Sequence, residues 1–262
     1  MVFYFTGTGN SLFAAKELEE KQISIPQAVH DEKKVYKDER IGIVCPIYGH
    51  EMPLMVKEFL REATFQTAYF YVVLTYGNIH GGAAELAEKY LQSIGKEAQY
   101  INTIKMVDNF LPGFDMEEQL ATLPEKKVEK NLASIKADID GKKVWKPPIT
   151  QEDRGWHKGF LERSAGIASF GMQQLYKVTD DCIGCGICMN VCPAGCIHLE
   201  GQKAVHGIQN CQMCMACIHH CPQNAIRLCM PEKNPNARYH NPDVRLTEIV
   251  EANRQDEGGA TA

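Results

Sequence analysis

The chain has 262 residues, of which 44% are hydrophobic and 23% charged, and its formal net charge is -5. This length and balance suit a sizeable globular core with a smaller second module, and the net charge argues against the clustered basic surface of a nucleic-acid-binding protein. No apolar run approaches the roughly 20 residues that cross a bilayer, and the N-terminus has no basic segment typical of a secretion signal. We therefore expect a cytoplasmic protein without a nucleic-acid partner or a membrane span.

The first 110 residues alternate strand-like and helix-like segments. Apolar and aromatic runs predict strands at residues 2–5, 41–48, 69–77 and 100–107. Amphipathic patterns predict helices that start near Ser11, Pro53 and Gly82. Such alternation indicates βαβ units. The expected fold class is therefore α/β, a doubly wound parallel sheet with helices on both faces, followed by a small α+β module.

The rest of the chain divides where its composition changes. Residues 115–140 predict one charged helix, and residues 155–177 predict another. Residues 142–148 (KKVWKPP) predict a linker, because consecutive prolines cannot continue a helix. The small, polar end after Asp256 is expected to be disordered. The expected divisions are the α/β domain at 1–148, a linker and helix at 149–178, the α+β module at 179–232 and a tail at 233–262.

Ten of the eleven cysteines follow residue 180. In a cytoplasmic chain this crowding points to metal rather than to disulfides, because the cytosol keeps thiols reduced. Two segments, CIGCGICMNVCP from Cys182 and CQMCMACIHHCP from Cys211, repeat the spacing Cys-x2-Cys-x2-Cys-x3-Cys-Pro. These segments resemble the bacterial two-cluster ferredoxins, in which the fourth cysteine of each run binds the other cluster. They therefore predict two 4Fe-4S clusters.

The expected ligand sets cross between the two segments. One cluster is expected on Cys182, Cys185, Cys188 and Cys221, and the other on Cys192, Cys211, Cys214 and Cys217. Gly184 and Gly186 allow backbone amides to approach the first cluster closely. Met213 and Met215 belong to the second segment, which has no glycine, so a different hydrogen-bond pattern and potential are expected there.

Zinc is the alternative metal, because CxxC pairs also form zinc ribbons and knuckles. A tetrahedral zinc site gains nothing from two identical four-cysteine segments that each end in Cys-Pro, so iron–sulfur clusters are favoured. The other three cysteines, Cys45, Cys196 and Cys229, lie outside the repeat and are interpreted as packing residues.

A second signal, TGTGNS, joins the first predicted strand to the first predicted helix. Free amides at a helix N-terminus and nearby hydroxyl groups are suitable donors to the phosphate of FMN. Side-chain donors are expected from Thr6, Thr8, Asn10 and Ser11, with Gly7 and Gly9 allowing the backbone to close around the phosphate. The loop lacks the GxxxxGK[ST] pattern of triphosphate sites and the third glycine of a dinucleotide fingerprint.

With this loop the N-terminal domain resembles the flavodoxins, which also hold FMN with loops after strands 3 and 4. The resemblance implies further FMN contacts from Pro46, Ile47, Tyr48, Gly49, Thr75, Tyr76, Gly77, Asn78, Gly81 and Gly82. It implies that Tyr48 stacks on the flavin, the alternative being an ordinary half-buried tyrosine. Asn109 and Phe110 are expected to line the same cleft. The sequence GNIHGG departs from stand-alone flavodoxins, which leaves open the residue that stacks on each ring face.

TGTGNS, TYGNIHGG, the doubled cysteine motif and the closing HNPDVRLTEIVEANRQ together are similar to flavodoxin–ferredoxin fusion proteins of anaerobic bacteria. This resemblance implies an electron-transfer protein that passes electrons between two 4Fe-4S clusters and FMN and exchanges them with a redox partner protein. The alternative is an FMN-dependent reductase of a small-molecule electron acceptor, with His50 and His80 as proton donors. Whether the chain is an enzyme therefore stays open at this point. A redox sensor is a third possibility, without a recognisable DNA-binding module in the sequence.

Overall fold

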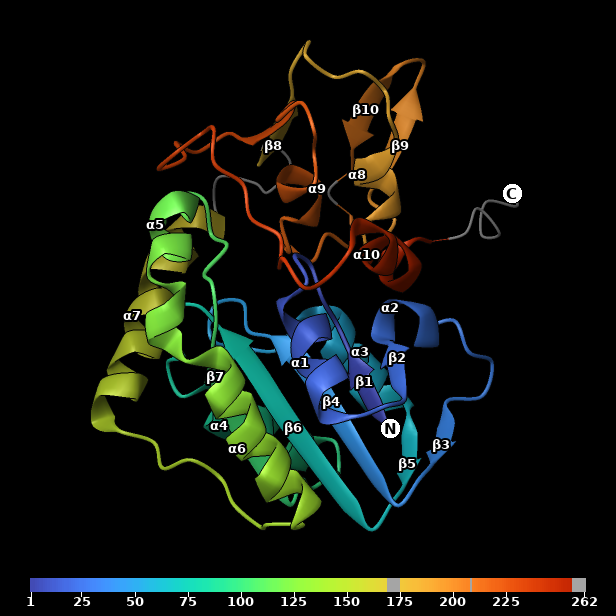
Figure 1. Cartoon of the computed structure of the whole chain (residues 1–262), viewed down its shortest axis with the longest axis vertical. Helices are drawn as coiled ribbons and strands as arrows, with labels where there is room; N and C mark the ends of the chain where they lie inside the picture. The colour runs from blue at the N-terminus through green and yellow to red at the C-terminus, as the bar shows by residue number, and fades with distance from the viewer. Residues whose placement is uncertain (169–174, 208, 256–262) are drawn as a thin grey trace.

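The computed structural model describes residues 1–168, 175–207 and 209–255 (Figure 1). An α/β domain occupies the N-terminal half of the chain, and a smaller module of short helices and strands lies at the carboxyl ends of its strands. The disorder predicted after Asp256 falls outside the described residues.

Five parallel strands form the central sheet in the order β2-β1-β4-β6-β7. Their bounds are β1 (Val2–Tyr4), β2 (Gln22–Ser24), β4 (Arg40–Pro46), β6 (Tyr69–Tyr76) and β7 (Tyr100–Lys105). The middle strands are buried almost throughout, as expected of a parallel sheet covered on both faces. The predicted α/β class is confirmed, and the strand order is consistent with a flavodoxin-like domain.

Helices cover both faces of this sheet (Figure 1). Two of them, α1 (Asn10–Leu18) and α6 (Val128–Asp140), pack together on one face, while α3 (Leu54–Glu62) and α4 (Ala83–Ser93) lie on the other. Each helix buries one apolar stripe against the sheet, as an amphipathic pattern requires. Short elements complete the domain, namely α2 (Ile25–Ala28), β3 (Val35–Lys37) and β5 (Thr64–Gln66).

Residues 115–140 do not form the single helix predicted from the sequence. The chain forms α5 (Met116–Ala121), a 3-10 turn η1 (Leu123–Lys126) and then α6. Pro124 lies in the turn, and Lys127 has a positive φ of 51°, so the α-helical hydrogen-bond ladder is interrupted there.

The segment between the two modules also differs from its prediction. Trp145, inside the expected linker, forms a parallel bridge with Tyr100 at the edge of β7. The helix predicted over 155–177 begins earlier, as α7 (Gln151–Ala168). Its residues 169–174 lie outside the described residues, and residues 176–177 are in strand β8 (Tyr176–Val178).

The C-terminal module is doubled in structure as in sequence. Strand β8 pairs antiparallel with β11 (Ile226–Leu228), and β9 (Ile197–Glu200) pairs antiparallel with β10 (Lys203–His206). Two short helices, α8 (Ile187–Asn190) and α9 (Ala216–His219), carry the third cysteine of each motif. The following tail contains α10 (Leu246–Asn253), which returns to the N-terminal domain and packs beside α2 (Figure 1).

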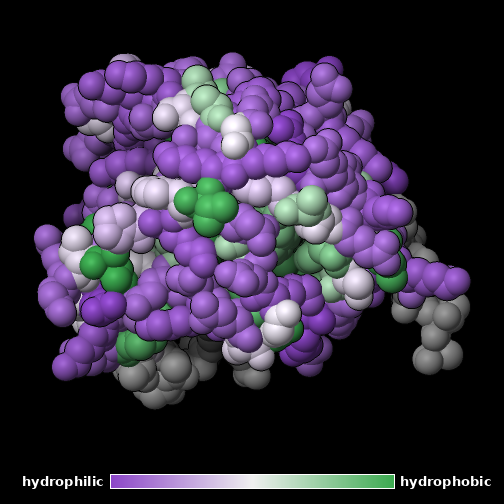
Figure 2. Space-filling model, turned by 90° about the horizontal axis from the view of Figure 1, so that it is seen from below, coloured by the Kyte–Doolittle hydropathy of each residue, from purple (hydrophilic) through white to green (hydrophobic). Residues whose placement is uncertain are grey.

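The end of the α/β domain away from this module is mainly hydrophilic. Figure 2 shows hydrophobic residues there in small separate groups rather than in one patch. Among the described helices, none combines the length and the apolar character needed to cross a membrane. The chemistry-bearing residues gather at the opposite end, where the strands meet the cysteine module.

Candidate functional site

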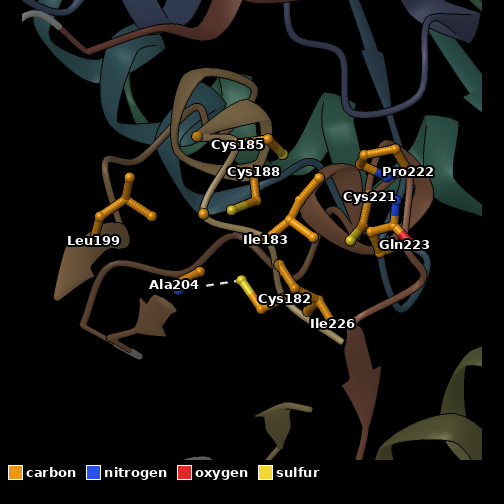
Figure 3. Close-up of a pocket in the computed structure, with 12 residues that line it drawn as sticks. Cys182, Ile183, Cys185, Cys188, Leu199, Ala204, Cys221, Pro222, Gln223 and Ile226 are labelled. Atoms are coloured by element: carbon orange, nitrogen blue, oxygen red, sulfur yellow. Dashed lines mark hydrogen bonds between the residues drawn. The ribbon is translucent and has the colours of Figure 1, made fainter. Parts of the chain in front are cut away.

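The first cysteine pocket is built from both halves of the doubled motif. Cys182, Cys185 and Cys188 line it from the first cysteine loop (residues 182–192), and Cys221 lines it from the second cysteine loop (residues 211–221) (Figure 3). The amide of Ala204 donates to Cys182 Sγ at 3.4 Å. Four sulfurs therefore surround one small space, three from one loop and one from the other.

The second cysteine pocket repeats this arrangement with the two loops exchanged. It is lined by Cys211, Cys214 and Cys217 together with Cys192 from the first cysteine loop. The amide of Cys196 donates to Cys192 Sγ at 3.2 Å. The equivalent contact in the first pocket is the amide of Ala225 to Cys221 Sγ, also 3.2 Å. The eight predicted ligands are thus brought together in two crossed groups.

The two cysteine loops share a backbone shape although their sequences differ. Gly184 and Gly186 have positive φ values of 66° and 76°, and the equivalent Met213 and Met215 have 54° and 58°. Methionine is strained in this left-handed region, whereas glycine is not. The second cysteine loop therefore keeps the geometry of the first at a conformational cost.

The spacing of these cysteines differs from that of a site for one ion. No group of three or more His, Cys, Asp or Glu side chains in the described residues is arranged to hold a single metal ion. In a cubane each thiolate binds a different iron, so four sulfurs must stand around a larger volume. Burial raises the pKa of the Cys188 thiol to about 11, so a metal cation bound there would have to stabilise the thiolate.

The two pockets differ in their exposure. Cys185 is exposed and the neighbouring Ile183 keeps 59% of its surface accessible, so the first pocket lies close to solvent. Cys214 and Cys217 are buried, and Cys214 packs with the core of the N-terminal domain. The second pocket therefore lies on the inner side of the module.

The cysteines outside the motif have different environments. Cys45 is buried in strand β4, and Cys229 is exposed. Cys196 lies closer to the second pocket, where its Sγ contacts the Gln209 carbonyl oxygen at 3.2 Å. Their interpretation as packing residues stays a prediction.

The second cysteine loop contacts the N-terminal domain directly. A Cβ on Gly7 would lie 2.7 Å from the carbonyl oxygen of Cys214, so only glycine allows this approach. Gln212 Oε1 accepts a hydrogen bond from the amide of Met55 at 2.9 Å and so caps the first turn of α3. The inner pocket is consequently held against the end of strand β1.

A buried histidine, His219, makes a second connection between the cysteine module and the N-terminal domain. His219 Nε2 donates to the Asn109 carbonyl oxygen at 2.8 Å, while the amide of Tyr239 donates to His219 Nδ1 at 3.1 Å. Burial lowers the pKa of His219 to about 3, so the ring is neutral and both of its nitrogens are used. Neither Gln212 nor His219 was predicted, because nothing in the local pattern distinguishes a side chain that contacts another module.

The TGTGNS loop is nearly inaccessible to solvent. Thr6 Oγ1 accepts from the amide of Gly9 at 3.1 Å, and Thr8 Oγ1 accepts from Asn109 Nδ2 at 3.0 Å. Ser11 Oγ shares a hydrogen bond of 2.9 Å with Thr75 Oγ1 on β6. The Thr6 and Thr8 hydroxyl groups thus accept hydrogen bonds here and keep their own O–H groups to donate, whereas Ser11 is paired with Thr75.

The loop after β4 lies between the second cysteine pocket and α7. Burial, then the neighbouring Cys214, Cys45 and Cys211, raise the pKa of the Tyr48 phenol well above its usual value. On the other side Phe160 packs on Gly49, whose Cβ would lie 2.5 Å from that ring. Pro46 ends the strand, and the amide of Ile47 donates to the Thr75 carbonyl oxygen at 3.1 Å.

The loop after β6 is packed against its surroundings at each glycine. A Cβ on Gly77, Gly81 or Gly82 would meet Asp108, His50 and Ile149 respectively, at 2.5 Å or less. The amide of Asn78 donates to the Asp108 carboxylate, and Tyr76 packs edge-on against His80. These predicted residues gather beside the loop after β4, and their glycines serve close packing.

Two crossed groups of four cysteines, one near solvent and one facing a core, define an iron–sulfur module of the ferredoxin type. A family model described as a 4Fe-4S dicluster domain matches residues 174–222. A ferredoxin of Methanothermococcus thermolithotrophicus is 38% identical over 50 residues, which are 18% of this chain and 83% of that protein. Through this module the chain belongs to the 4Fe-4S dicluster ferredoxins, and electron transfer is the activity of that family.

Two larger proteins contain a similar module. A polyferredoxin protein of Methanothermus fervidus is 37% identical over 51 residues, and one component of an ion-translocating oxidoreductase complex of Methanosarcina acetivorans is 45% identical over 47 residues. In both cases 18% of this chain is matched, and the chain spans only 11% and 18% of the length of these two relatives. The similarity lies in the cysteine module.

Proposed function

We propose that this chain is an electron-transfer protein with two 4Fe-4S clusters. The first cluster would be held by Cys182, Cys185, Cys188 and Cys221, and the second by Cys192, Cys211, Cys214 and Cys217. The crossed composition of the two pockets supports this assignment, because each motif contributes three sulfurs to one pocket and one to the other. Amides that donate to Cys182, Cys192, Cys211 and Cys221 would help to set the two potentials.

The placement of the two pockets supports a relay role. The first pocket lies beside exposed Ile183 and Cys185, where a redox partner protein can approach. The second pocket abuts the TGTGNS loop through Cys214 and Gly7. This contact is the observation that carries the proposal, because a cluster held in the second pocket would lie against the strand ends of the N-terminal domain.

We further propose that the N-terminal domain is a flavodoxin-like domain that binds FMN at this edge. Within the described residues, the amides of Thr8, Asn10 and Ser11 donate to no protein acceptor although the loop is buried. Buried amides normally have partners, so this set of donors fits a phosphate at the N-terminus of α1. FMN exchanges one or two electrons where clusters exchange one. Tyr48 and the loops 46–50 and 75–82 would surround the ring.

A second candidate function is reduction of a small molecule, and one cluster of side chains favours it. His50 and His157 lie with their ring centroids 5.6 Å apart, and both have a buried Nδ1 without a partner in the described chain. His80 Nδ1 lies 3.6 Å from Asp153. Imidazoles beside the proposed ring site are suited to proton transfer near neutral pH.

Cofactor analysis after anaerobic purification tests the proposal. We expect about eight irons and one FMN per chain, and zinc without flavin would refute it. Ile183→Asp should slow electron exchange with a reduced ferredoxin several-fold while the iron content stays at the wild-type level. Val144→Asp, at a residue that is 75% exposed on the other domain, is the matched control. Rapid oxidation by a small molecule, but by no protein, would favour the reductase.

A further inference from the structure

The segment 239–253, here called the C-terminal clamp, closes over the TGTGNS loop. The amide of Asn241 donates to the Thr8 carbonyl oxygen at 2.8 Å. Asn253 Nδ2 donates to the Thr6 carbonyl oxygen at 2.9 Å. The clamp thus binds two carbonyl groups of the TGTGNS loop, although the clamp and the loop lie more than 200 residues apart in the chain.

The side-chain oxygen of Asn10 is engaged by the same segment. The Tyr239 hydroxyl donates to Asn10 Oδ1 at 2.5 Å, and Asn241 Nδ2 donates to the same oxygen at 3.3 Å. Asn10 Nδ2 donates to the Val107 carbonyl oxygen at 3.1 Å. Asn10 is therefore an anchor for the clamp, although the sequence motif suggested a direct phosphate donor.

Gly9 has a second role that the motif did not indicate. Its φ is 98°, and a Cβ would lie 2.9 Å from the Asn241 Cβ and 3.2 Å from the Val244 Cβ. A side chain at this position would push the clamp away from the loop. The glycine therefore permits the clamp to close.

The clamp leaves the ligand-binding donors of the loop unused. The clamp forms hydrogen bonds with carbonyl oxygens of the loop and with the Asn10 side chain. The backbone amides of Thr8, Asn10 and Ser11 donate to no acceptor in the described residues. Asn253 Oδ1 is also buried without a partner in the part of the chain that the structure describes. The loop therefore has partners on its carbonyl side, whereas these amide donors are without a partner among the described residues.

Asn253 also connects the loop to the cysteine module. Its Nδ2 donates to the Val191 carbonyl oxygen at 3.1 Å in addition to Thr6. Val191 directly precedes Cys192, a proposed ligand of the second cluster. One fully buried amide group therefore joins the loop, the clamp and the inner cysteine pocket.

We infer that the C-terminal clamp is the cover of the FMN phosphate site and couples FMN retention to docking of the cysteine module. This inference rests on the proposed binding of FMN. A ligand that binds only the closed loop stabilises the closed clamp, and by linkage the closed clamp slows release of the ligand. Asn253 and Tyr239 are positioning residues in this scheme, because they hold the loop without touching the phosphate.

The test measures FMN release from the full-length, cluster-loaded protein by the rise of flavin fluorescence on dilution. Asn253→Ala and Tyr239→Phe should each release FMN about ten-fold faster, since each removes hydrogen bonds that hold the closed loop. Asn236→Ala, at an exposed asparagine just before the clamp, is the matched control and should release FMN at the wild-type rate. Iron content serves to verify that each variant is folded.

A second measurement covers the case in which Asn253→Ala does not fold. Hydrogen exchange of the wild-type amides in 239–253 should be at least several-fold slower with FMN bound than without it. Equal exchange rates, or FMN release from Tyr239→Phe at the wild-type rate, would overturn the inference while leaving FMN binding intact. A wild-type protein that retains no FMN after reconstitution would overturn FMN binding and this inference together.

Discussion

Gly7, in the loop after strand β1, lies directly against the backbone carbonyl of Cys214 in the second cysteine loop. A Cβ on Gly7 would come within 2.7 Å of that oxygen. Because a backbone atom forms the contact, no side-chain movement can relieve it. The distance between the inner cysteine pocket and the sheet therefore depends on the absence of one methyl group.

Replacing Gly7 should separate the two modules. We expect Gly7→Ala to lower the free energy of unfolding by about 1–3 kcal/mol, since overpacking forces the backbone to shift. Denaturant unfolding of the anaerobic protein measures this change. Gly155→Ala is the matched control, because no atom lies within 4 Å of its Cβ on helix α7. The free energy of unfolding of Gly155→Ala should equal that of the wild type or exceed it by about 0.5–1 kcal/mol. Equal stability of Gly7→Ala and wild type would contradict the close contact.

The crossed ligand sets predict which cluster each cysteine serves. Cys221→Ala should damage the cluster on Cys182, Cys185 and Cys188, and Cys192→Ala should damage the cluster on Cys211, Cys214 and Cys217. Electron paramagnetic resonance of the reduced protein distinguishes the two losses. If each variant instead lost the cluster of its sequence neighbours, the crossed assignment would be wrong.

The two glycines of the first cysteine loop should differ in their tolerance of a side chain. At Gly186 an alanine has space for its Cβ, but the backbone φ is 76°. We therefore expect Gly186→Ala to lower the free energy of unfolding by about 1 kcal/mol. At Gly184 the φ is 66°, and a Cβ would also lie 2.7 Å from the Gln202 carbonyl oxygen. Gly184→Ala should therefore lower the free energy of unfolding by clearly more than Gly186→Ala does. Iron retention during a temperature ramp ranks the two variants. Better iron retention by Gly184→Ala than by Gly186→Ala would show that the backbone at Gln202 can move to make room for the added Cβ.

Helix α7 should detach more readily in acid. Burial, then the neighbouring His157, His80 and Arg163, lower the pKa of His50 in the folded protein. The folded state therefore binds fewer protons than the unfolded state, so the stabilisation is complete above about pH 6.5 and is lost as the pH falls. His50 contacts Phe160 on α7, so limited proteolysis of α7 at about pH 5.5 and 7.5 follows the effect.

His50→Asn is the matched variant for that experiment. Asparagine accepts the positive φ of 73° at this position but does not titrate. The pH dependence of α7 cleavage should be smaller in this variant than in the wild type. An unchanged dependence would assign the effect to other groups near α7, such as Asp153 on the same helix.

Local sequence determined the features that depend on neighbouring residues. The apolar runs of β1, β4, β6 and β7 and the spacing of the eight motif cysteines are local patterns, and alternating strands and helices lead to a parallel sheet. The same reasoning was wrong over 115–140, where Pro124 interrupts the helix, and it did not locate β2, in which Ile23 is the one apolar residue.

Only the tertiary structure decided how the two modules meet. The sequence motif assigned Gly7, Gly9 and Asn10 to a phosphate, whereas the fold also uses them to receive Cys214 and the C-terminal clamp. Contacts such as Asn253 to Thr6 join residues about 250 positions apart, and their strength comes from burial of both groups. No periodicity or spacing records such a contact, because it exists only once the chain has folded.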